Sequence, residues 1–145
     1  MKNSIKSFQL FVRPDEKSRQ IAKNICELNS KLSHSLDECD DADLVIAIGG
    51  DGTFIDAVTS TNFSKSKIYT GIHTGTLGFL QDLSENDIFS LINYINFEQD
   101  LKTRKVYTAL IKILQKDGKV NTFYAFNEIV IGGDCYSKIS FSEYI

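Results

Sequence analysis

The sequence has little of what a secreted or membrane-spanning protein requires. Its 145 residues include one proline, no tryptophan and three cysteines, and no apolar run approaches the ~20 residues that span a bilayer. Cys26, Cys39 and Cys135 lie far apart without a Cys-x-x-Cys spacing, which favours reduced thiols over a zinc site or a disulfide framework. No signal-peptide core follows the N-terminal residues. We therefore expect a cytoplasmic protein with no membrane partner.

The sequence also has few positively charged residues and no cluster of them. The 16 lysines and arginines are scattered and are outnumbered by 19 acidic residues, giving a formal net charge of −3. A nucleic-acid-binding surface needs a basic patch that displaces counterions, so no nucleic acid partner is expected. Acidic residues crowd into residues 33–43 without the glycine of a calcium loop, and this stretch is expected to be a solvated loop.

The apolar residues that are present follow the periods of alternating strands and helices. Residues 44–48 are apolar on both alternating faces, as in a strand buried inside a parallel sheet. The expected elements are strands at 7–12, 44–48 and 68–72 and helices at 14–32, 53–61 and 84–94. This order predicts an α/β fold, a doubly wound, Rossmann- or flavodoxin-like domain whose ligands bind beyond the carboxyl ends of the strands.

The pattern changes near residue 101. Residues 107–114 and 122–131 are strand-rich and flank Asp117-Gly118, a strong hairpin signal, and residues 139–145 alternate apolar with polar side chains. Two or three strands are too few for an independently stable sheet. We therefore expect an α/β domain at residues 1–100 and, at 101–145, the opening strands of an incomplete all-β domain.

Residues 49–54, Gly-Gly-Asp-Gly-Thr-Phe, directly follow the buried strand. No Gly-Lys-Ser/Thr follows, so they form no Walker A loop, and Ile55 stands where the third glycine of a dinucleotide fingerprint would lie. Three glycines in a strand-to-helix turn nevertheless favour a backbone that is open to phosphate. Asp51 has two interpretations: an N-cap of the following helix, or a carboxylate that accepts a proton from a ligand hydroxyl as that hydroxyl attacks a phosphoryl group.

Three stretches together resemble the motifs of the NAD kinase family. They are residues 49–54, residues 71–80 (Gly-Ile-His-Thr-Gly-Thr-Leu-Gly-Phe-Leu) and residues 126–131 (Phe-Asn-Glu-Ile-Val-Ile). The first alone is not decisive, since diacylglycerol kinase-like lipid kinases and phosphofructokinases carry similar loops. The resemblance covers nearly the whole chain but only about the first half of a family member. It implies phosphorylation of the adenosine ribose 2′-hydroxyl of NAD, by ATP with Mg²⁺ or in some members by polyphosphate, to give NADP.

The resemblance also implies roles for residues of the two glycine loops. Asp51 matches the general base for the 2′-hydroxyl, and Gly50, Gly52 and Thr53 belong to the loop that meets the dinucleotide. Phe79 matches a residue that lines the adenine pocket, with a core aromatic after a turn as the alternative.

The third motif supplies two further candidates. Asn127 and Glu128 match the pair that binds the adenosine portion of NAD. Independently of the family, an amide and a carboxylate within an apolar strand need partners, either a ligand or water at an exposed strand end. In the family the NAD site is completed partly across a subunit interface, which implies a homo-oligomer, dimer or tetramer, in the complete protein.

Two alternatives to an active NAD kinase stay open. One is a truncated nucleotide-binding fragment without activity on its own, because the family's second glycine-aspartate motif and its Thr-Pro-Thr-Gly-Ser stretch are expected beyond residue 145. The other is a diacylglycerol kinase-like lipid kinase. Residues 74–79 do not supply the Leu-Gly-Thr-Gly-Asn-Asp order that such an enzyme would need.

Overall fold

A computed structural model describes residues 5–32, 34–75, 78–97 and 102–126. The chain divides into two compact units, Met1–Tyr107 and Thr108–Ile145, and each is described by itself. The first unit contains β1 (Ser7–Val12), α1 (Glu16–Ser30), β2 (Asp37–Glu38), β3 (Leu44–Gly49), α2 (Asp51–Ser60), β4 (Ile68–His73), the 3-10 turn η1 (Glu85–Asp87) and α3 (Ile88–Phe97). The second contains β5 (Ala109–Leu114) and β6 (Val120–Ala125).

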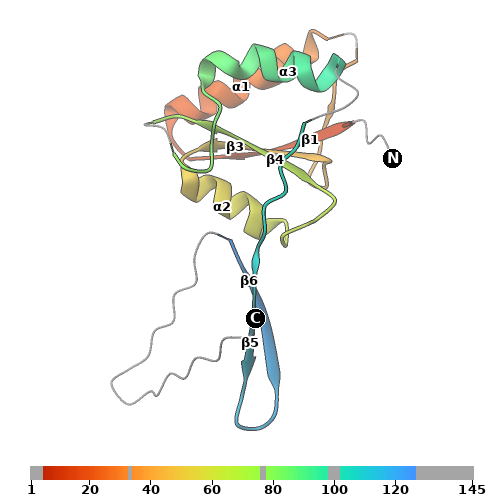
Figure 1. Cartoon of the computed structure of the whole chain (residues 1–145). Helices are drawn as coiled ribbons and strands as arrows, with labels where there is room; N and C mark the ends of the chain where they lie inside the picture. The colour runs from red at the N-terminus through yellow and green to blue at the C-terminus, as the bar shows by residue number, and fades with distance from the viewer. Residues whose placement is uncertain (1–4, 33, 76–77, 98–101, 127–145) are drawn as a thin grey trace. The chain divides into compact units, whose positions relative to one another are not determined.

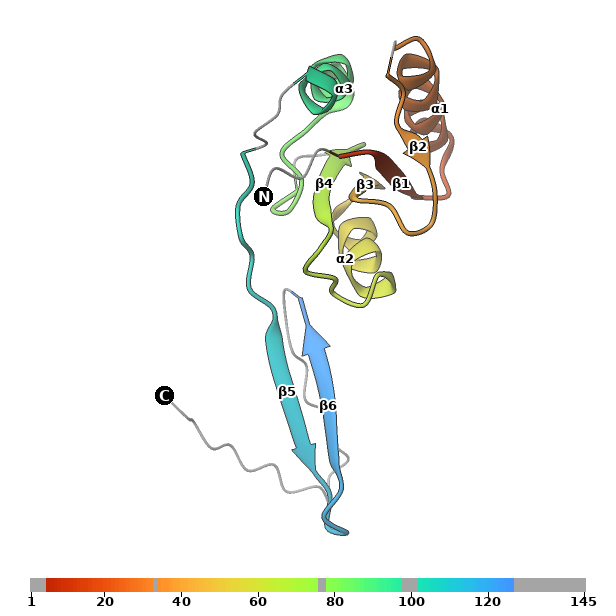
Figure 2. The same ribbon diagram turned by 90° about the vertical axis from the view of Figure 1, so that its right-hand side faces the viewer.

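The first unit is a parallel sheet covered on both faces by helices. Its strands pair in the order β2-β1-β3-β4, and every pair is parallel. Helices α1 and α3 lie over one face of the sheet and α2 lies over the other (Figures 1 and 2). This confirms the α/β fold class, because the helix after β1 and the helix after β3 lie on opposite faces of the sheet, as in doubly wound folds.

Strand β3 forms the centre of this unit and is buried along its whole length. Leu44, Ile46 and Ile48 face α1 and α3, whereas Val45 and Ala47 pack toward α2. Burying one such branched side chain contributes about 1.5–3 kcal/mol, so two apolar faces favour a central strand strongly. The uninterrupted apolar run in the sequence therefore has a direct structural cause.

The acidic stretch at residues 33–43 is more than the solvated loop that the sequence predicts, because it contains β2. Ser7 pairs with Asp37 and Phe8 with Glu38, which adds a short strand at the edge of the sheet. The side-chain amide of buried Asn29 holds this segment, since its Nδ2 donates to the Leu36 carbonyl at 2.9 Å and its Oδ1 accepts from the Leu36 N–H at 2.9 Å. These tertiary hydrogen bonds leave no trace in a local sequence pattern.

The second unit, as far as it is described, is the antiparallel hairpin of β5 and β6. Ala109 pairs with Ala125 and Leu114 with Val120, and the turn between the strands contains Gly118 with a φ of 84°. None of the described residues from 102 to 126 is buried. The hairpin confirms the predicted turn, while residues 127–131 and 139–145 lie outside the described residues. That residues 101–145 begin an all-β domain stays a prediction.

Among the described residues, no helix is both long enough and apolar enough to cross a bilayer.

Candidate functional site

The carboxyl ends of β1, β3 and β4 meet at one edge of the sheet. The Arg13 N–H, just after β1, donates to the carbonyl of Ile48 at 2.9 Å, and the Thr74 N–H, just after β4, donates to the carbonyl of Gly49 at 3.0 Å. Three loops that are distant in sequence are therefore joined by backbone hydrogen bonds. This is the edge where ligands bind in doubly wound sheets, and β1 and β3 are the strands at which the connections change face.

Gly49 permits the tight passage between β3 and α2. A Cβ at this position would lie 2.9 Å from the Cβ of Arg13 and 3.0 Å from the Cβ of Thr53, closer than side-chain carbons approach one another. Any side chain here would push the loop away from the end of β1. Close approach of the backbone therefore requires the first glycine of residues 49–54.

Gly50 and Gly52 differ from Gly49, because neither is required by packing. Apart from each glycine itself, its two neighbours in the chain and the backbone of α2, no described atom lies within 4 Å of the place where a Cβ would stand at either position. Their missing side chains open space in front of the loop. The sequence-based expectation that these two glycines leave room for a ligand agrees with this geometry, and their contact with a ligand stays a prediction.

Asp51 is the first residue of α2, and its carboxylate turns away from its own helix. The N-cap of α2 is Gly50, which makes no side-chain capping hydrogen bond, so the N-cap interpretation of Asp51 is wrong. Instead Oδ2 accepts from the backbone N–H of Phe79 at 2.9 Å and Oδ1 accepts from that of Leu80 at 3.1 Å. The carboxylate thus bridges the two glycine loops that the sequence singled out separately.

Gly78 makes this bridge sterically possible. A Cβ at position 78 would lie 2.8 Å from the Cγ of Asp51. The second glycine loop consequently approaches the carboxylate closely enough for its backbone amides to donate. The sequence alone indicates no role for Gly78 within residues 71–80, because only the three-dimensional structure shows that it contacts Asp51.

The side chain of Phe79 is exposed to solvent beside the Asp51 carboxylate. Its side chain is 96% exposed while its backbone N–H is held by Asp51. The alternative that Phe79 is a core aromatic is therefore wrong. An exposed aromatic ring anchored beside a carboxylate is suited to stacking on a flat ligand group.

The amino end of α2 carries backbone donors. The carbonyl of Gly50 accepts from the N–H of Thr53 at 2.9 Å and of Phe54 at 3.3 Å, which closes the first turn. The N–H groups of Asp51 and Gly52 donate to no carbonyl among the described residues. Free amides at a helix N-terminus, reinforced by the helix dipole, favour an anion such as phosphate.

Two cations from the β1 loop and α1 stand at the same edge. The Nζ of Lys17 donates to the carbonyl of Thr74 at 2.8 Å, and Nε of Arg13 lies 3.4 Å from a carboxylate oxygen of Asp15. Hydrogen bonds from the backbone N–H and hydroxyl of Ser18 lower the pKa of Asp15, and Arg13 adds to this effect. Sequence reasoning missed Arg13 and Lys17, because scattered basic residues give no signal until the fold gathers them.

Asn127 and Glu128 lie outside the described residues, so the role that the sequence predicts for them stays a prediction. Within the described ranges, no group of three or more His, Cys, Asp or Glu side chains is arranged to hold a metal ion.

The predicted site residues that the structure brings together come from the first two motifs. They are Asp51, Gly50, Gly52, Thr53 and Phe79.

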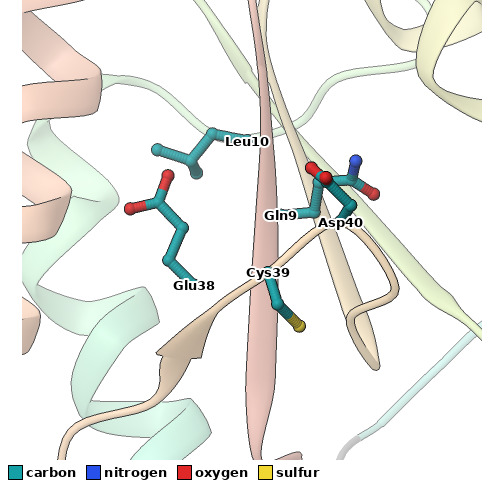
Figure 3. Close-up of a pocket in the computed structure, with 5 residues that line it drawn as sticks. All are labelled: Gln9, Leu10, Glu38, Cys39 and Asp40. Carbon is teal, nitrogen blue, oxygen red and sulfur yellow. The ribbon is translucent and has the colours of Figure 1, made fainter.

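A separate cavity of about 260 Å³ lies beside β1 at the place where β2 ends, and it is lined by residues 9–10 and 38–40. In Figure 3 the side chains of Leu10 and Glu38 lie to one side of β1, and those of Gln9 and Asp40 lie to the other. Its volume falls below the ~300–1,000 Å³ of small-molecule sites, and it contains none of the predicted site residues. The glycine-loop edge is the better candidate.

Comparison with known proteins identifies the family of the chain. Residues 13–100 match the model of the ATP-NAD kinase N-terminal domain. The chain is 31% identical over 123 residues to a protein named NAD kinase 2 from Oceanobacillus iheyensis, covering 83% of this chain and 44% of that protein. It is 31% identical over 135 residues to an NAD kinase from Streptococcus pneumoniae, covering 90% of this chain and 48% of that protein. The chain thus spans a little under half the length of these relatives.

Proposed function

The chain belongs to the NAD kinase family, and on that premise we propose that it serves the phosphorylation of NAD at the adenosine ribose 2′-hydroxyl to give NADP. ATP or polyphosphate is the proposed phosphoryl donor. The observation that carries the proposal is the Asp51 carboxylate, held by two backbone N–H groups of the second glycine loop beside the open space at Gly50 and Gly52. Such a carboxylate is oriented before any substrate arrives, which is what positioning catalysis requires.

Asp51 is the proposed general base. An ionised carboxylate offers about four lone-pair positions, and the N–H groups of Phe79 and Leu80 occupy two of them. A remaining one accepts the proton of the 2′-hydroxyl while that oxygen forms its bond to the terminal phosphorus of ATP. The bond from this phosphorus to the bridging oxygen breaks, and ADP leaves with the electron pair. General-base catalysis of this kind contributes about 10²- to 10⁴-fold in rate.

The N–H groups of Asp51 and Gly52 are the proposed donors to the transferring phosphate. Both lie at the positive end of the α2 dipole. At the same edge Lys17 adds a positive charge, and Arg13 adds one that the carboxylate of Asp15 partly offsets. ATP would enter the proposed reaction with Mg²⁺, and the charge of that ion would offset the negative charge of the phosphate oxygens. A chain with a net negative charge binds a polyanion through such local groups and not through its overall field.

The exposed ring of Phe79 is the proposed stacking partner of the adenine of NAD, with Asn127 and Glu128 as the predicted partners of the adenosine. NAD and ATP are then the partners of the site. A cytoplasmic location and assembly into a homo-oligomer remain part of the proposal.

A chain that binds nucleotide without forming NADP by itself is the second candidate. It is favoured by the fact that the chain spans 44% and 48% of the two relatives. The lipid kinase alternative loses its support, because the family is that of NAD kinases.

The deciding experiment compares NADP formation by the whole protein with that of its Asp51→Asn variant. Asparagine keeps the shape and one oxygen acceptor but cannot take a proton, so we expect the rate to fall about 10²- to 10⁴-fold. The melting temperature should fall by only a few degrees, because one of the N–H groups of Phe79 and Leu80 loses its acceptor while α2 stays capped at Gly50. Equal rates in the two proteins would rule out the general base. A large loss of melting temperature would assign Asp51 a structural role instead.

An experiment on the 145-residue chain alone distinguishes the second candidate, nucleotide binding without NADP formation, from the first. Binding of NAD or ATP, measured by calorimetry, without NADP formation would support it, whereas turnover by this chain would exclude it.

A further inference from the structure

Gln81 is a buried polar side chain that ties the second glycine loop to the first. It is 0% exposed, and its Nε2 donates to the carbonyl of Gly50 at 2.7 Å. The same carbonyl also accepts from the N–H groups of Thr53 and Phe54, both within the first turn of α2. Gln81 therefore adds a donor from a segment that does not belong to the helix.

Packing alone does not account for a glutamine at this place. Its Oε1 is buried and accepts no hydrogen bond from any described residue, which is unfavourable for a side-chain acceptor. A Cβ at Gly71 of β4 would lie 3.0 Å from the Cδ of Gln81, so the strand carries no side chain where the amide lies. Methionine would fill a similar volume without an unsatisfied oxygen. What the amide supplies, and methionine cannot, is the hydrogen bond to Gly50.

We infer that Gln81 is a positioning residue that fixes the peptide between Gly50 and Asp51. A peptide unit is planar and trans, so holding the Gly50 carbonyl fixes the Asp51 N–H in the opposite direction, as one of the free donors of α2. The preceding residues, Phe79 and Leu80, donate to the Asp51 carboxylate. One three-residue segment thus holds both the proposed base and the backbone that carries the proposed phosphate donors.

The link to catalysis rests on the proposed function, but the link between Gln81 and the glycine loop does not. The two are therefore tested by separate measurements. The first measurement uses the 145-residue chain and needs no substrate.

Gln81→Met is the variant that removes the hydrogen bond and keeps the volume. We expect amide hydrogen exchange at Phe79 and Leu80 to become about tenfold faster, because the segment loses its anchor on Gly50. The melting temperature should stay the same or rise, since the variant also removes the unsatisfied Oε1. A residue with a merely structural role would instead lower the melting temperature and leave these two amides unaffected.

Gln9→Met is the matched control. Gln9 on β1 is the other described glutamine with a buried, unpartnered Oε1, and it contacts neither glycine loop through any of the described hydrogen bonds. We expect this variant to leave exchange at Phe79 and Leu80 within twofold of the natural chain. If both variants accelerate exchange equally, the effect comes from losing a buried amide in general and the inference is wrong.

Gln81→Glu gives a rescue that depends on pH. An ionised glutamate has no proton to donate to the Gly50 carbonyl, whereas a protonated one donates from the same place. Burial raises the pKa of a glutamic acid at this place, so protection of Phe79 and Leu80, expressed relative to free peptide, should be kept at low pH and lost as the pH is raised and the side chain ionises. Protection that stays lost at every pH at which the variant is folded, by its melting temperature, would overturn the inference.

Kinetics of the whole protein complete the test. Gln81→Met should lower kcat for NADP formation about tenfold while KM for NAD changes less than about threefold, because the base and the phosphate donors are misplaced but the adenine site is not. An unchanged kcat overturns the catalytic part of the inference. If the natural protein forms no NADP while Gln81→Met still accelerates exchange, the proposed function fails and the positioning of the loop by Gln81 stands.

Discussion

At the residue scale, the position of the Asp51 carboxylate depends on the absence of a side chain at Gly78. In Gly78→Ala the added methyl would lie 2.8 Å from the Asp51 Cγ, so the carboxylate has to turn away from the N–H groups of Phe79 and Leu80. We expect NADP formation by the whole protein to fall about a hundredfold, in line with loss of a placed base. Exchange at both amides should accelerate.

Gly75→Ala is the control for this change. Apart from Gly75 itself and its two neighbours in the chain, no described atom lies within 4 Å of the place where a Cβ would stand, so the same methyl meets no other described group. If the two variants lose activity equally, added stiffness of the loop explains the loss and the contact with Asp51 does not.

Single residues of this site differ in how visible they are in the sequence. Asp51 and the glycines around it are evident, because an acid among glycines behind an apolar run is unusual. Gln81 is not, since a glutamine after a loop is ordinarily exposed and only its burial under Gly50 gives it a role. Phe79 was open to two interpretations, and its exposure decides against the core.

At the element scale, α1 begins at Glu16, two residues after Pro14, where the sequence predicts its start. Pro14 precedes the N-cap Asp15, whose carboxylate accepts from the Ser18 N–H at 2.9 Å and from the Ser18 hydroxyl at 2.8 Å. These donors lower the pKa of Asp15 below its ordinary value. The cap orients the first turn of α1, from which Lys17 reaches the site.

This cap makes the stability of the first unit depend on pH. Because the pKa of Asp15 is lower in the folded chain than in the unfolded chain, its contribution is fully present above about pH 4 and is lost as the pH falls through the folded value. We expect Asp15→Ala to melt a few degrees below the natural chain at pH 7 and to approach it at pH 3. Thermal melts at both pH values measure the difference.

Asp15→Asn separates charge from capping. Asparagine caps a helix about as well as aspartate but does not titrate. Its melting-temperature advantage over Asp15→Ala should therefore not shrink between pH 7 and pH 3. If the natural chain melts above Asp15→Ala by the same amount at pH 7 and pH 3, the stabilisation of the ionised Asp15 carboxylate by Ser18 is contradicted.

At the scale of the whole molecule, the order of elements was predictable but the order of strands was not. Apolar runs such as residues 44–48 carry their period in the sequence, so each predicted strand and helix of the first unit overlaps an element that occurs there, although the helix ends differ by some residues. The edge strand β2 was not predicted, because its two acidic residues carry no strand signal and pair with Ser7 and Phe8 through the backbone. The gathering of Arg13, Gly50 and Phe79 at one edge likewise follows only from the parallel pairing.

The distribution of buried side chains predicts that the first unit folds without the second. Every buried apolar residue that the structure describes lies between Ile5 and Ile95, and none lies in the hairpin of β5 and β6. A chain ending at Tyr107 should therefore keep one cooperative thermal transition, with a midpoint within a few degrees of that of the 145-residue chain. Residues 108–126 alone should show no cooperative transition, because an isolated two-stranded hairpin is at best marginally stable in water. Loss of the transition in the shortened chain, followed by circular dichroism, would mean that residues beyond Tyr107 supply part of the core that holds the glycine loops.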